Sequence, residues 1–428
     1  MIEGDGTTSP SLRSWVDVPA GSDFPIQNLP YGVFTRGNEW HLGVAIGESI
    51  LDLNSAARAG FFDAYAFRDT LLQPALNHVL ASGKAAWTAL RARVSALLEA
   101  GNREIADRGL IDFVLVKQAN VVMQMPFVVR NYVDFYSSLE HATNMGKILR
   151  PGGEALLPNW RYVPIGYHGR AGTVVVDGTP IARPCGQARP SESAPPSYGP
   201  TKALDIELET GFVTGGPTPF GTPLPIASAE DTIFGMVLVN DWSARDIQSW
   251  EYQPLGPFLG KSFATSISAW VVSLDALAPF RIDGPSQDPP PLEYLRRPRP
   301  FTFDIALAVE LRTAAMRRAA EIARSNFKYL YWDMAQQLAH AASNGASVEP
   351  GDLYASGTIS GPVQGSYGSL MELTWRGARP LKLPSGEERR WLEDGDTVTL
   401  RGWCERDGAA RIGFGSVSGT ISPARCSA

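Results

Sequence analysis

The stretch that decides the fold class is Phe234-Gly235-Met236-Val237-Leu238-Val239-Asn240-Asp241. Its first six residues carry no polar side chain and a polar pair ends it, which is typical of a strand buried on both faces. Further strand-like runs lie on either side, at residues 173–176, 204–209, 269–274, 303–311, 370–375, 397–403 and 412–416. The sequence therefore predicts a mainly β protein of the α+β class.

Composition narrows the class of protein. The 428 residues include 42 glycines and 33 prolines, which favours short strands and tight turns over long helices. The apolar fraction of 44% and the charged fraction of 19% are those of a globular chain and exclude intrinsic disorder. The net charge is −6, and no stretch approaches the ~20 apolar residues of a membrane span. We therefore expect neither nucleic acid nor a membrane as a partner.

Cysteine usage and the N-terminus bear on the compartment. Cys185, Cys404 and Cys426 are widely spaced and form no C-x-x-C pair, which excludes a zinc finger. We expect these thiols to be unpaired, as in a reducing compartment. Residues 1–6 are acidic and lack the apolar core of a secretory leader. These features predict a cytoplasmic protein.

The chain divides into two regions by pattern. Residues 15–53 alternate short apolar runs with glycine turns, which predicts a small barrel or sheet, and residues 71–100 place apolar side chains at helical spacing. From Pro126 onward strand-like runs prevail, with one helix expected over 326–343. We predict an N-terminal domain over 1–125 and a second domain over 126–428.

Carboxylates inside the apolar strands are the first candidates for chemistry. In residues 204–209 the side chains of Asp205, Glu207 and Glu209 fall on one face of a strand, because strand side chains alternate. Such a face is either solvated or suited to a hard divalent cation. Asp241 either ends its strand in an ordinary turn or presents its carboxylate at the mouth of the sheet. The following segment, 241–263, concentrates polar side chains between glycine-proline turns, which is typical of a binding loop.

Histidine is rare, so candidates for a general base near neutral pH are few. Of the five histidines, His141 has the best neighbourhood, because a helix beginning near Ser137 would place it one turn in, with Asp134 just before the helix. His168 lies in a turn and either binds substrate or caps a loop. We predict His141 as the base.

Longer strings in a fixed order resemble one family. They are residues 134–144, 162–169, 204–209, 240–265, 326–345 and 356–372. Together they resemble the fumarylacetoacetate hydrolase family over almost the whole chain. The resemblance implies a small SH3-like N-terminal barrel, a larger C-terminal mixed β-roll and a homodimer.

The resemblance also implies site residues. Those matching calcium ligands are Asp134, Glu207, Glu209 and Asp241, and those beside a second, magnesium-type site are Lys261 and Thr265. His141 matches the general base and Glu372 its orienting partner. Those matching substrate contacts are Tyr136, Arg150, Tyr167, Gln248, Tyr252 and Thr358. Those facing the developing charge are Arg245, Gln248 and Lys261. One departure is Ala264, where the family pattern usually has glycine.

The implied reaction is hydrolysis of the C–C bond of the β-diketone 4-fumarylacetoacetate, a small-molecule substrate, in tyrosine and phenylalanine catabolism. A base can activate water, and Ca²⁺ or Mg²⁺ can polarise the diketone oxygens. No G-x-S-x-G elbow and no G-x-G-x-x-G turn is present, so neither a serine nucleophile nor a nucleotide cofactor is indicated. The alternatives are acylpyruvate hydrolysis, or 2-oxoacid decarboxylation or hydration, on the same scaffold. A catalytically inactive, calcium-dependent binding protein is the alternative outside enzymes.

Overall fold

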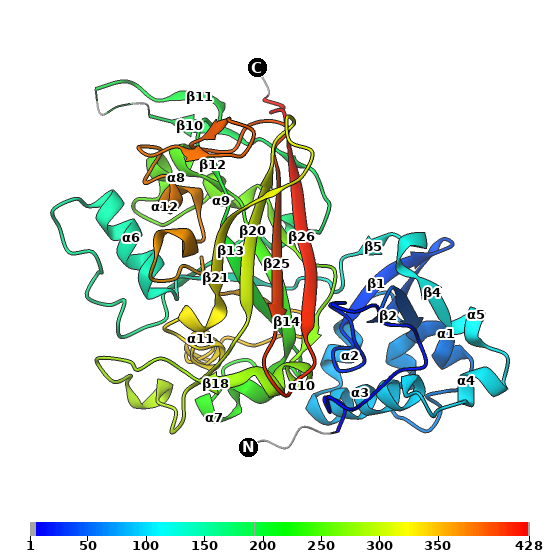
Figure 1. Ribbon diagram of the computed structural model, residues 1–428. Coiled ribbons are helices and arrows are strands. Elements are labelled where there is room, and N and C mark those ends of the chain that lie inside the picture. The colour runs from blue at the N-terminus through cyan, green and yellow to red at the C-terminus, as the bar shows by residue number, and fades with distance from the viewer. Residues whose placement is uncertain (1–5, 190, 192, 427–428) are drawn as a thin grey trace.

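The predicted strand at residues 234–241 lies at the centre of the larger part of the molecule (Figure 1). The computed structural model describes residues 6–189, 191 and 193–426. In it, β14 (Ile233–Asp241) is buried along its whole length and belongs to an eight-stranded sheet. The order is β7 (Gly166–His168), β6 (Tyr132–Phe135), β22 (Leu353–Ala355), β13 (Leu208–Thr214), β14, β16 (Thr265–Ile267) and β8 (Val174–Val176), with β17 (Val272–Ser273) also paired to β14. The prediction of a strand buried on both faces is confirmed.

A second sheet packs against β14. Its order is β21 (Ala320–Asn326), β20 (Ala306–Arg312), β25 (Thr397–Cys404), β26 (Ile412–Ser422) and β9 (Ile181–Ala182). The approach is close at Gly402 of β25, where an added Cβ would stand 2.7 Å from the Leu238 side chain of β14. The space between the sheets is filled by one hydrophobic core that includes Leu238, Leu307 and Phe414. The burial of this core holds the strands that carry the site.

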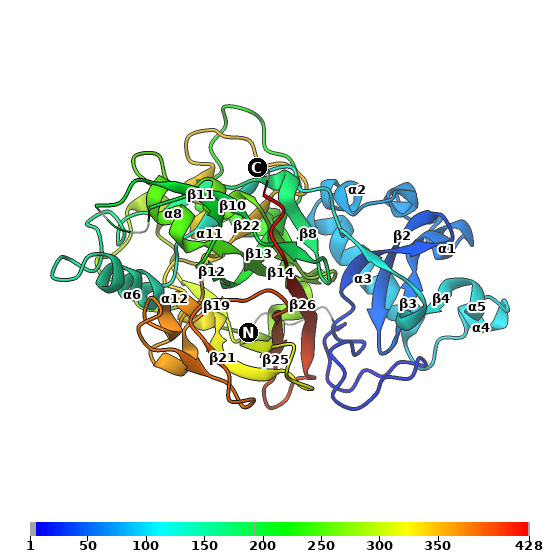
Figure 2. The ribbon, with the colours of Figure 1, turned by 90° about the horizontal axis from the view of Figure 1, so that it is seen from above.

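The N-terminal part is a five-stranded antiparallel sheet with short helices, at the opposite side of the molecule from α6 (Leu139–Leu149) (Figures 1 and 2). The strand order is β4 (Leu115–Lys117), β3 (Ser49–Asp52), β2 (Glu39–Ile46), β1 (Tyr31–Arg36) and β5 (Met123–Gln124). The helices are α1 (Leu53–Arg58), α2 (Asn77–Ala81), α3 (Lys84–Leu98), α4 (Glu104–Asp107) and α5 (Ile111–Val114). Backbone hydrogen bonds between Tyr31 and Val271 join this sheet to the larger part, and the two parts share a hydrophobic core.

Short elements complete the larger part. The strands are β10 (Cys185–Ala188), β11 (Ser197–Pro200), β12 (Leu204–Asp205), β15 (Ser243–Ala244), β18 (Arg281–Asp283), β19 (Phe301–Phe303), β23 (Leu381–Lys382) and β24 (Glu388–Arg389). The helices are α7 (Ile226–Ala229), α8 (Arg245–Glu251), α9 (Leu259–Ser262), α10 (Leu274–Leu277), α11 (Met334–Ala341) and α12 (Leu370–Leu373). Within the described ranges, no helix has the length and apolar character needed to cross a membrane.

Four local predictions need correction. Residues 71–100 do not form one helical block: a 3-10 turn (Arg68–Leu72), α2 and α3 are separated by Pro74 and by Gly83, which has a φ of +80°. The helix expected over 326–343 is shorter, because the capping box of Asp333 and Gln336 starts α11 there. The expected strand over 204–209 is divided into β12 and β13, which belong to different sheets.

The fourth correction concerns residues 370–375, where α12 replaces the expected strand. Ser369 accepts a hydrogen bond from the backbone N–H of Glu372 at its N-terminus. The pattern Ser369-x-x-Glu372 is a signature of a helix start that the strand prediction overlooked. This short helix matters for the site because Glu372, one of its residues, makes tertiary contacts.

The expectation of unpaired cysteines is wrong for two of them. Cys185 and Cys426 form a disulfide, whereas Cys404 is a free, buried thiol. The bonded pair is 241 residues apart in sequence, so no local spacing indicated it. Of residues 1–6, from which the sequence predicts no secretory leader, residues 1–5 lie outside the described ranges.

Reducing the Cys185–Cys426 bond is expected to destabilise the protein. The bond closes a long loop, and such cross-links contribute about 2–4 kcal/mol by restricting the unfolded chain. Thermal unfolding with dithiothreitol should give a Tm several degrees below that of the oxidised protein. Cys426→Ser should show the lower Tm with or without reductant. Equal Tm values for oxidised and reduced parent protein, with free thiols verified by mass spectrometry, would contradict this expectation.

Candidate active site

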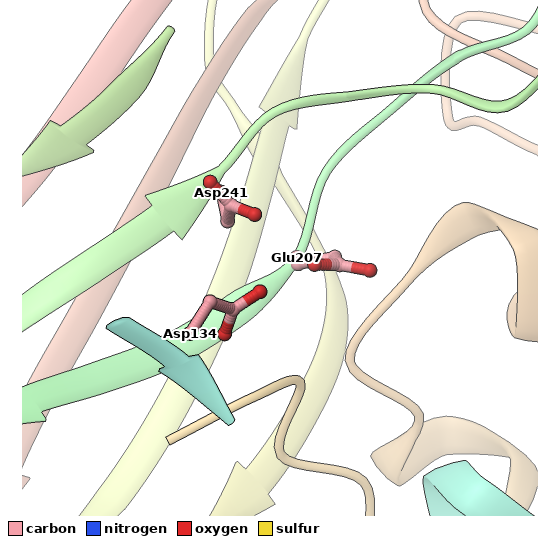
Figure 3. Close-up of side chains that lie close together, drawn as sticks. All are labelled: Asp134, Glu207 and Asp241. Atoms are coloured by element: carbon pink, nitrogen blue, oxygen red, sulfur yellow. The ribbon is translucent and has the colours of Figure 1, made fainter. Parts of the chain in front are cut away.

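Three carboxylates, two on strands and one just before a strand, converge at one end of the central sheet (Figure 3). Asp241 ends β14, and Glu207 precedes Leu208, which pairs with Asn240 across the antiparallel β13–β14 ladder. Asp134 lies on β6 and pairs with Ala355 of β22, which in turn pairs with β13. One oxygen from each carboxylate lies within 4.8 Å of the others, and all three side chains are buried. Sheet register therefore brings distant acids together.

A fourth carboxylate, Glu209, is not part of this close trio but lies near enough to interact with the charges of all three. One of its oxygens accepts a hydrogen bond from the backbone N–H of Gly357 at 3.0 Å. Burial raises the pKa of Glu209 well above its usual value, and the negative charge of Asp134 raises it further. Burial likewise raises the pKa of Asp134, with Asp241 adding to the effect. Because Asp205, Glu207 and Glu209 are all buried, the alternative that they form a solvated strand face is excluded.

The residues present fit a divalent cation. Asp134 Oδ1 and Glu209 Oε1 are buried and receive no hydrogen bond. Unpartnered buried carboxylate oxygens are costly unless a positive charge compensates them, and hard divalent cations prefer oxygen ligands. The buried acids thus form a candidate cation site in this mainly apolar sheet.

Two basic side chains compensate the cluster in part. The Lys261 ammonium on α9 donates to Glu207 and, at 2.7 Å, to Asp241, while an Arg245 Nη2 lies 2.8 Å from Glu207 Oε1. Burial alone would raise the pKa of Glu207, but the charges of Lys261 and Arg245 outweigh it and lower this pKa to about 2. Glu207 is therefore an anion at any pH where the protein would function.

Two hydroxyl groups complete the surroundings of Asp241. Thr265 donates to Asp241 Oδ1 at 2.6 Å, and Tyr167 donates to Oδ2 at 3.3 Å. The methyl group of Ala264 packs in the hydrophobic core. The predicted neighbourhood of Asp241, Lys261 and Thr265 thus exists as a connected set of hydrogen bonds.

The second functional element is a buried histidine–carboxylate pair. Ser138 caps α6 by accepting from the His141 N–H, so the helix begins where the sequence predicted. His141 Nδ1 lies 2.7 Å from Glu372 Oε2. Burial tends to raise the pKa of Glu372, but the charge and hydrogen bond of His141 outweigh it, and the pKa is lowered. The Glu372 carboxylate orients the His141 ring, and the second ring nitrogen, Nε2, remains available to accept a proton.

Three side chains that sequence reasoning missed hold Glu372 in place. Ser360 donates to the carboxylate at 2.9 Å, Ser369 donates at 2.8 Å, and the Asn144 amide donates at 3.0 Å. Asn144 follows His141 by three residues, so a helical wheel places both on one face. Ser360 gives no sequence signal, because it reaches Glu372 only through the fold.

The predicted substrate contacts surround these two elements to differing degrees. The rings of Tyr136 and His141 meet in a T-shaped arrangement with centroids 5.3 Å apart, and Gln248 accepts from Arg245 at 3.2 Å. Thr358 is buried with no partner for its hydroxyl. In contrast, Arg150 and Tyr252 do not contact the buried cluster: both are exposed, and Arg150 donates to the Ala155 carbonyl. Burial raises the pKa of the Tyr136 phenol, and the charge of Arg150 nevertheless acts on it by lowering this pKa against the effect of burial.

A cavity of about 440 Å³ reaches Asp241, one member of the acidic trio, together with Lys261. Asp241, Lys261, Tyr167, His168 and Phe258 are among its lining residues. This volume suits a small organic molecule. His168 lines this ligand-sized space, and its role in substrate binding stays a prediction.

Removing one of the crowded acids should stabilise the cation-free protein. In Glu209→Gln the repulsion among buried carboxylates falls, so the Tm in chelator at neutral pH should rise relative to the parent protein. The sign follows from the pKa values of Asp134 and Glu209, which are raised, so that ionising these groups opposes folding. The stabilisation on adding Ca²⁺ or Mg²⁺ should shrink. An unchanged Tm in chelator together with an unchanged cation response would contradict this expectation.

Comparison with known proteins identifies relatives along the whole chain. The model described as Fumarylacetoacetase N-terminal matches residues 27–126, and that described as Fumarylacetoacetate (FAA) hydrolase C-terminal matches residues 130–422. The chain is 52% identical over 416 residues to a fumarylacetoacetase of Bos taurus, covering 96% of this chain and 99% of the relative. It is 50% identical over 415 residues to the fumarylacetoacetase of Homo sapiens, with the same two coverages of 96% and 99%.

A solved structure shares the fold at low sequence identity. It is a fumarylacetoacetate hydrolase from psychrophilic Exiguobacterium antarcticum, with a TM-score of 0.52 and 16% identity, covering 93% of this chain and 100% of that one. This likeness concerns the architecture alone. With both family models and relatives of about 50% identity matching nearly end to end, the chain belongs to the fumarylacetoacetate hydrolase family.

Proposed function

We propose that this protein is a hydrolase that cleaves the C–C bond of 4-fumarylacetoacetate to give fumarate and acetoacetate, the last step of tyrosine and phenylalanine catabolism. The observation that carries the proposal is the buried His141–Glu372 pair beside an acidic cluster, in a chain about half identical to fumarylacetoacetases over nearly its full length. The reaction requires two elements: a base that activates water, and a cation site that polarises the diketone oxygens.

In the proposed mechanism, His141 takes a proton from the attacking water. The 2.7 Å contact to Glu372 holds the neutral ring with its proton on Nδ1, so that Nε2 is the accepting nitrogen. As the imidazolium forms, the ionised Glu372 stabilises its positive charge. The same proton can then be returned to the carbanion of the leaving acetoacetate, which restores neutral His141, while the new carboxylic acid group of fumarate releases its own proton to solvent.

Asp134, Glu207, Glu209 and Asp241 would hold the divalent cation, Ca²⁺ or Mg²⁺, with Lys261 and Thr265 beside a second, magnesium-type site. Once bound, the cation would act as a Lewis acid toward the diketone oxygens. Arg245, Gln248 and Lys261 face the charge that develops on the oxyanion and the enolate-like leaving group. Donors of this kind contribute about 3–4 kcal/mol each to transition-state stabilisation.

Binding of a dianionic substrate requires compensation of the negative cluster. Lys261 and Arg245 supply buried positive charge. We assign Arg150, which is exposed, to a terminal carboxylate, since a guanidinium matches its two oxygens. Tyr136, Tyr167, Tyr252 and Thr358 are the further proposed contacts, and the free hydroxyl of Thr358 supports this role.

We further propose two domains, over 1–125 and 126–428, in a cytoplasmic homodimer. The Cys185–Cys426 disulfide removes unpaired thiols as support for the cytoplasmic location. The resemblance of the long motifs to the family supports the division and the dimer. Size-exclusion chromatography with light scattering tests the dimer, and a monomeric mass at micromolar concentration would exclude it.

The test of the function follows the loss of the diketone absorbance of fumarylacetoacetate with purified protein, with and without chelator. We expect turnover that chelator abolishes and that added Ca²⁺ or Mg²⁺ restores. A flat trace with fumarylacetoacetate together with turnover of acylpyruvates would replace the proposal by the alternative on the same scaffold.

A further inference from the structure

Asp205 is a buried carboxylate outside the acidic trio, at the end of β12. In the antiparallel pair β12–β15 it lies opposite Ser243, two residues before Arg245. This register places Asp205 beside the start of α8. Asp205 therefore shares a strand face with Glu207 in the sequence pattern but is engaged elsewhere in the fold.

Both oxygens of Asp205 are occupied by donors from separate segments. Oδ2 accepts from Arg245 Nε at 2.8 Å and from the Met371 N–H at 3.1 Å. Oδ1 accepts from the Leu370 N–H at 2.7 Å and from the Ile206 N–H at 2.8 Å. A carboxylate saturated in this way is fixed in position and in turn fixes its donors.

The segment anchored on one side carries Glu372. Leu370 and Met371 are the first two residues of α12, whose backbone N–H groups would otherwise lack partners. Glu372 follows directly and reaches His141. Because α12 has only four residues, its place depends on such contacts more than on its own helical hydrogen bonds.

On the other side Asp205 sets the plane of the Arg245 guanidinium. With Nε held by Asp205, Nη2 lies 2.8 Å from Glu207 and Nη1 donates to Gln248 at 3.2 Å. Three fixed directions leave the planar group little rotation. The same carboxylate therefore holds the group proposed to face developing charge.

We infer that Asp205 is a positioning residue that keeps the His141–Glu372 pair and the Arg245 guanidinium in register with each other. The inference rests on the proposed catalytic roles of His141 and Arg245. Asp205 neither lines the cavity nor belongs to the acidic trio, so it acts through the groups it holds.

The test compares Asp205→Asn with Asp246→Asn in hydrolysis of fumarylacetoacetate. Asp246 is a matched control, because it follows Arg245 on α8 but accepts from Thr201 and the Lys202 N–H instead. In Asp205→Asn an amide NH2 replaces one of the two acceptors, so one pair of donors loses its partner: Arg245 Nε with the Met371 N–H, or the Leu370 N–H with the Ile206 N–H. We expect kcat to fall about 10- to 100-fold with KM changing less than threefold, while Asp246→Asn stays within twofold of the parent.

Double variants distinguish positioning from a general loss of stability. The loss from Asp205→Asn combined with Glu372→Gln, or with Arg245→Gln, should be smaller than the product of the single losses. Asp205→Glu, which keeps the charge but displaces the carboxylate by one methylene, should lose about tenfold in kcat at a parent-like KM. A folded Asp205→Asn with kcat within twofold of the parent, or losses that multiply in both pairs, would overturn the inference.

If circular dichroism shows that Asp205→Asn does not fold, Asp205→Glu takes its place. Parent-like kcat in that longer variant would then overturn the inference, and a tenfold loss at parent-like KM would support it. An inactive parent protein would instead refute the proposed function, so the two failures are distinguishable.

Discussion

Replacing His141 with alanine is expected to lower kcat by about 100- to 10,000-fold, the usual contribution of a positioned general base. The substitution removes the only side chain that joins Glu372 to the attacking water in the proposed mechanism. Glu372 keeps hydrogen bonds from Ser360, Ser369 and Asn144, so its buried charge remains solvated by the protein and the fold should persist. Stopped-flow or steady-state absorbance of the diketone measures the loss.

His78→Ala is the matched control for this variant. His78 is exposed on α2 of the N-terminal sheet region, so the same substitution should leave kcat unchanged. Circular dichroism and Tm establish that His141→Ala is folded. Parent-like kcat in folded His141→Ala would show that His141 is not the base.

Replacing Asp241 with asparagine is expected to abolish cation dependence and to lower kcat about a thousandfold. Asp241 contributes to the acidic trio and also receives hydrogen bonds from Lys261 and Thr265. Loss of its charge weakens cation binding and leaves Lys261 with Glu207 as its remaining carboxylate partner. A bound cation supplies several kcal/mol of charge stabilisation, and each 1.36 kcal/mol corresponds to a tenfold rate change.

Calorimetric titration with Ca²⁺ and Mg²⁺, together with activity in chelator, measures both effects. Asp396→Asn is the control, because Asp396 is also a buried aspartate paired to a cation, Arg389, on a different segment. That variant should lose stability but keep its cation response. Asp241→Asn that retains cation-dependent turnover would refute the role of Asp241 in the site.

Much of the candidate site was predictable from local sequence. The alternation in residues 204–209 separates acids from apolar residues, and the run ending in Asp241 indicates a buried strand. The Ser138 cap and His141 follow helix rules that act over one turn. These features depend on neighbours within a few residues, so composition and periodicity reveal them.

Other features depend on pairing across the chain, so local pattern does not reveal them, and only the family resemblance anticipated the site shared by Asp134, Glu207 and Asp241. Asp134 meets Glu207 and Asp241 only through the ladder of β6, β22, β13 and β14. The helix at residues 370–373, which its local Ser369 cap already favours, is held in place by Asp205, 165 residues away, which accepts the Leu370 N–H. Local propensity is weak, and such contacts reinforce it.

The sequence by itself determined the mainly β class, the buried strand at 234–241 and the residue types available for chemistry. These features depend on the order of neighbouring residues, which sets burial and strand periodicity. Only the tertiary structure decided which acids share one space, that Glu372 faces His141, and that Cys185 bonds Cys426. The physical reason is that hydrogen bonds and charge interactions act over a few ångströms in space, and sheet register sets that distance independently of separation along the chain.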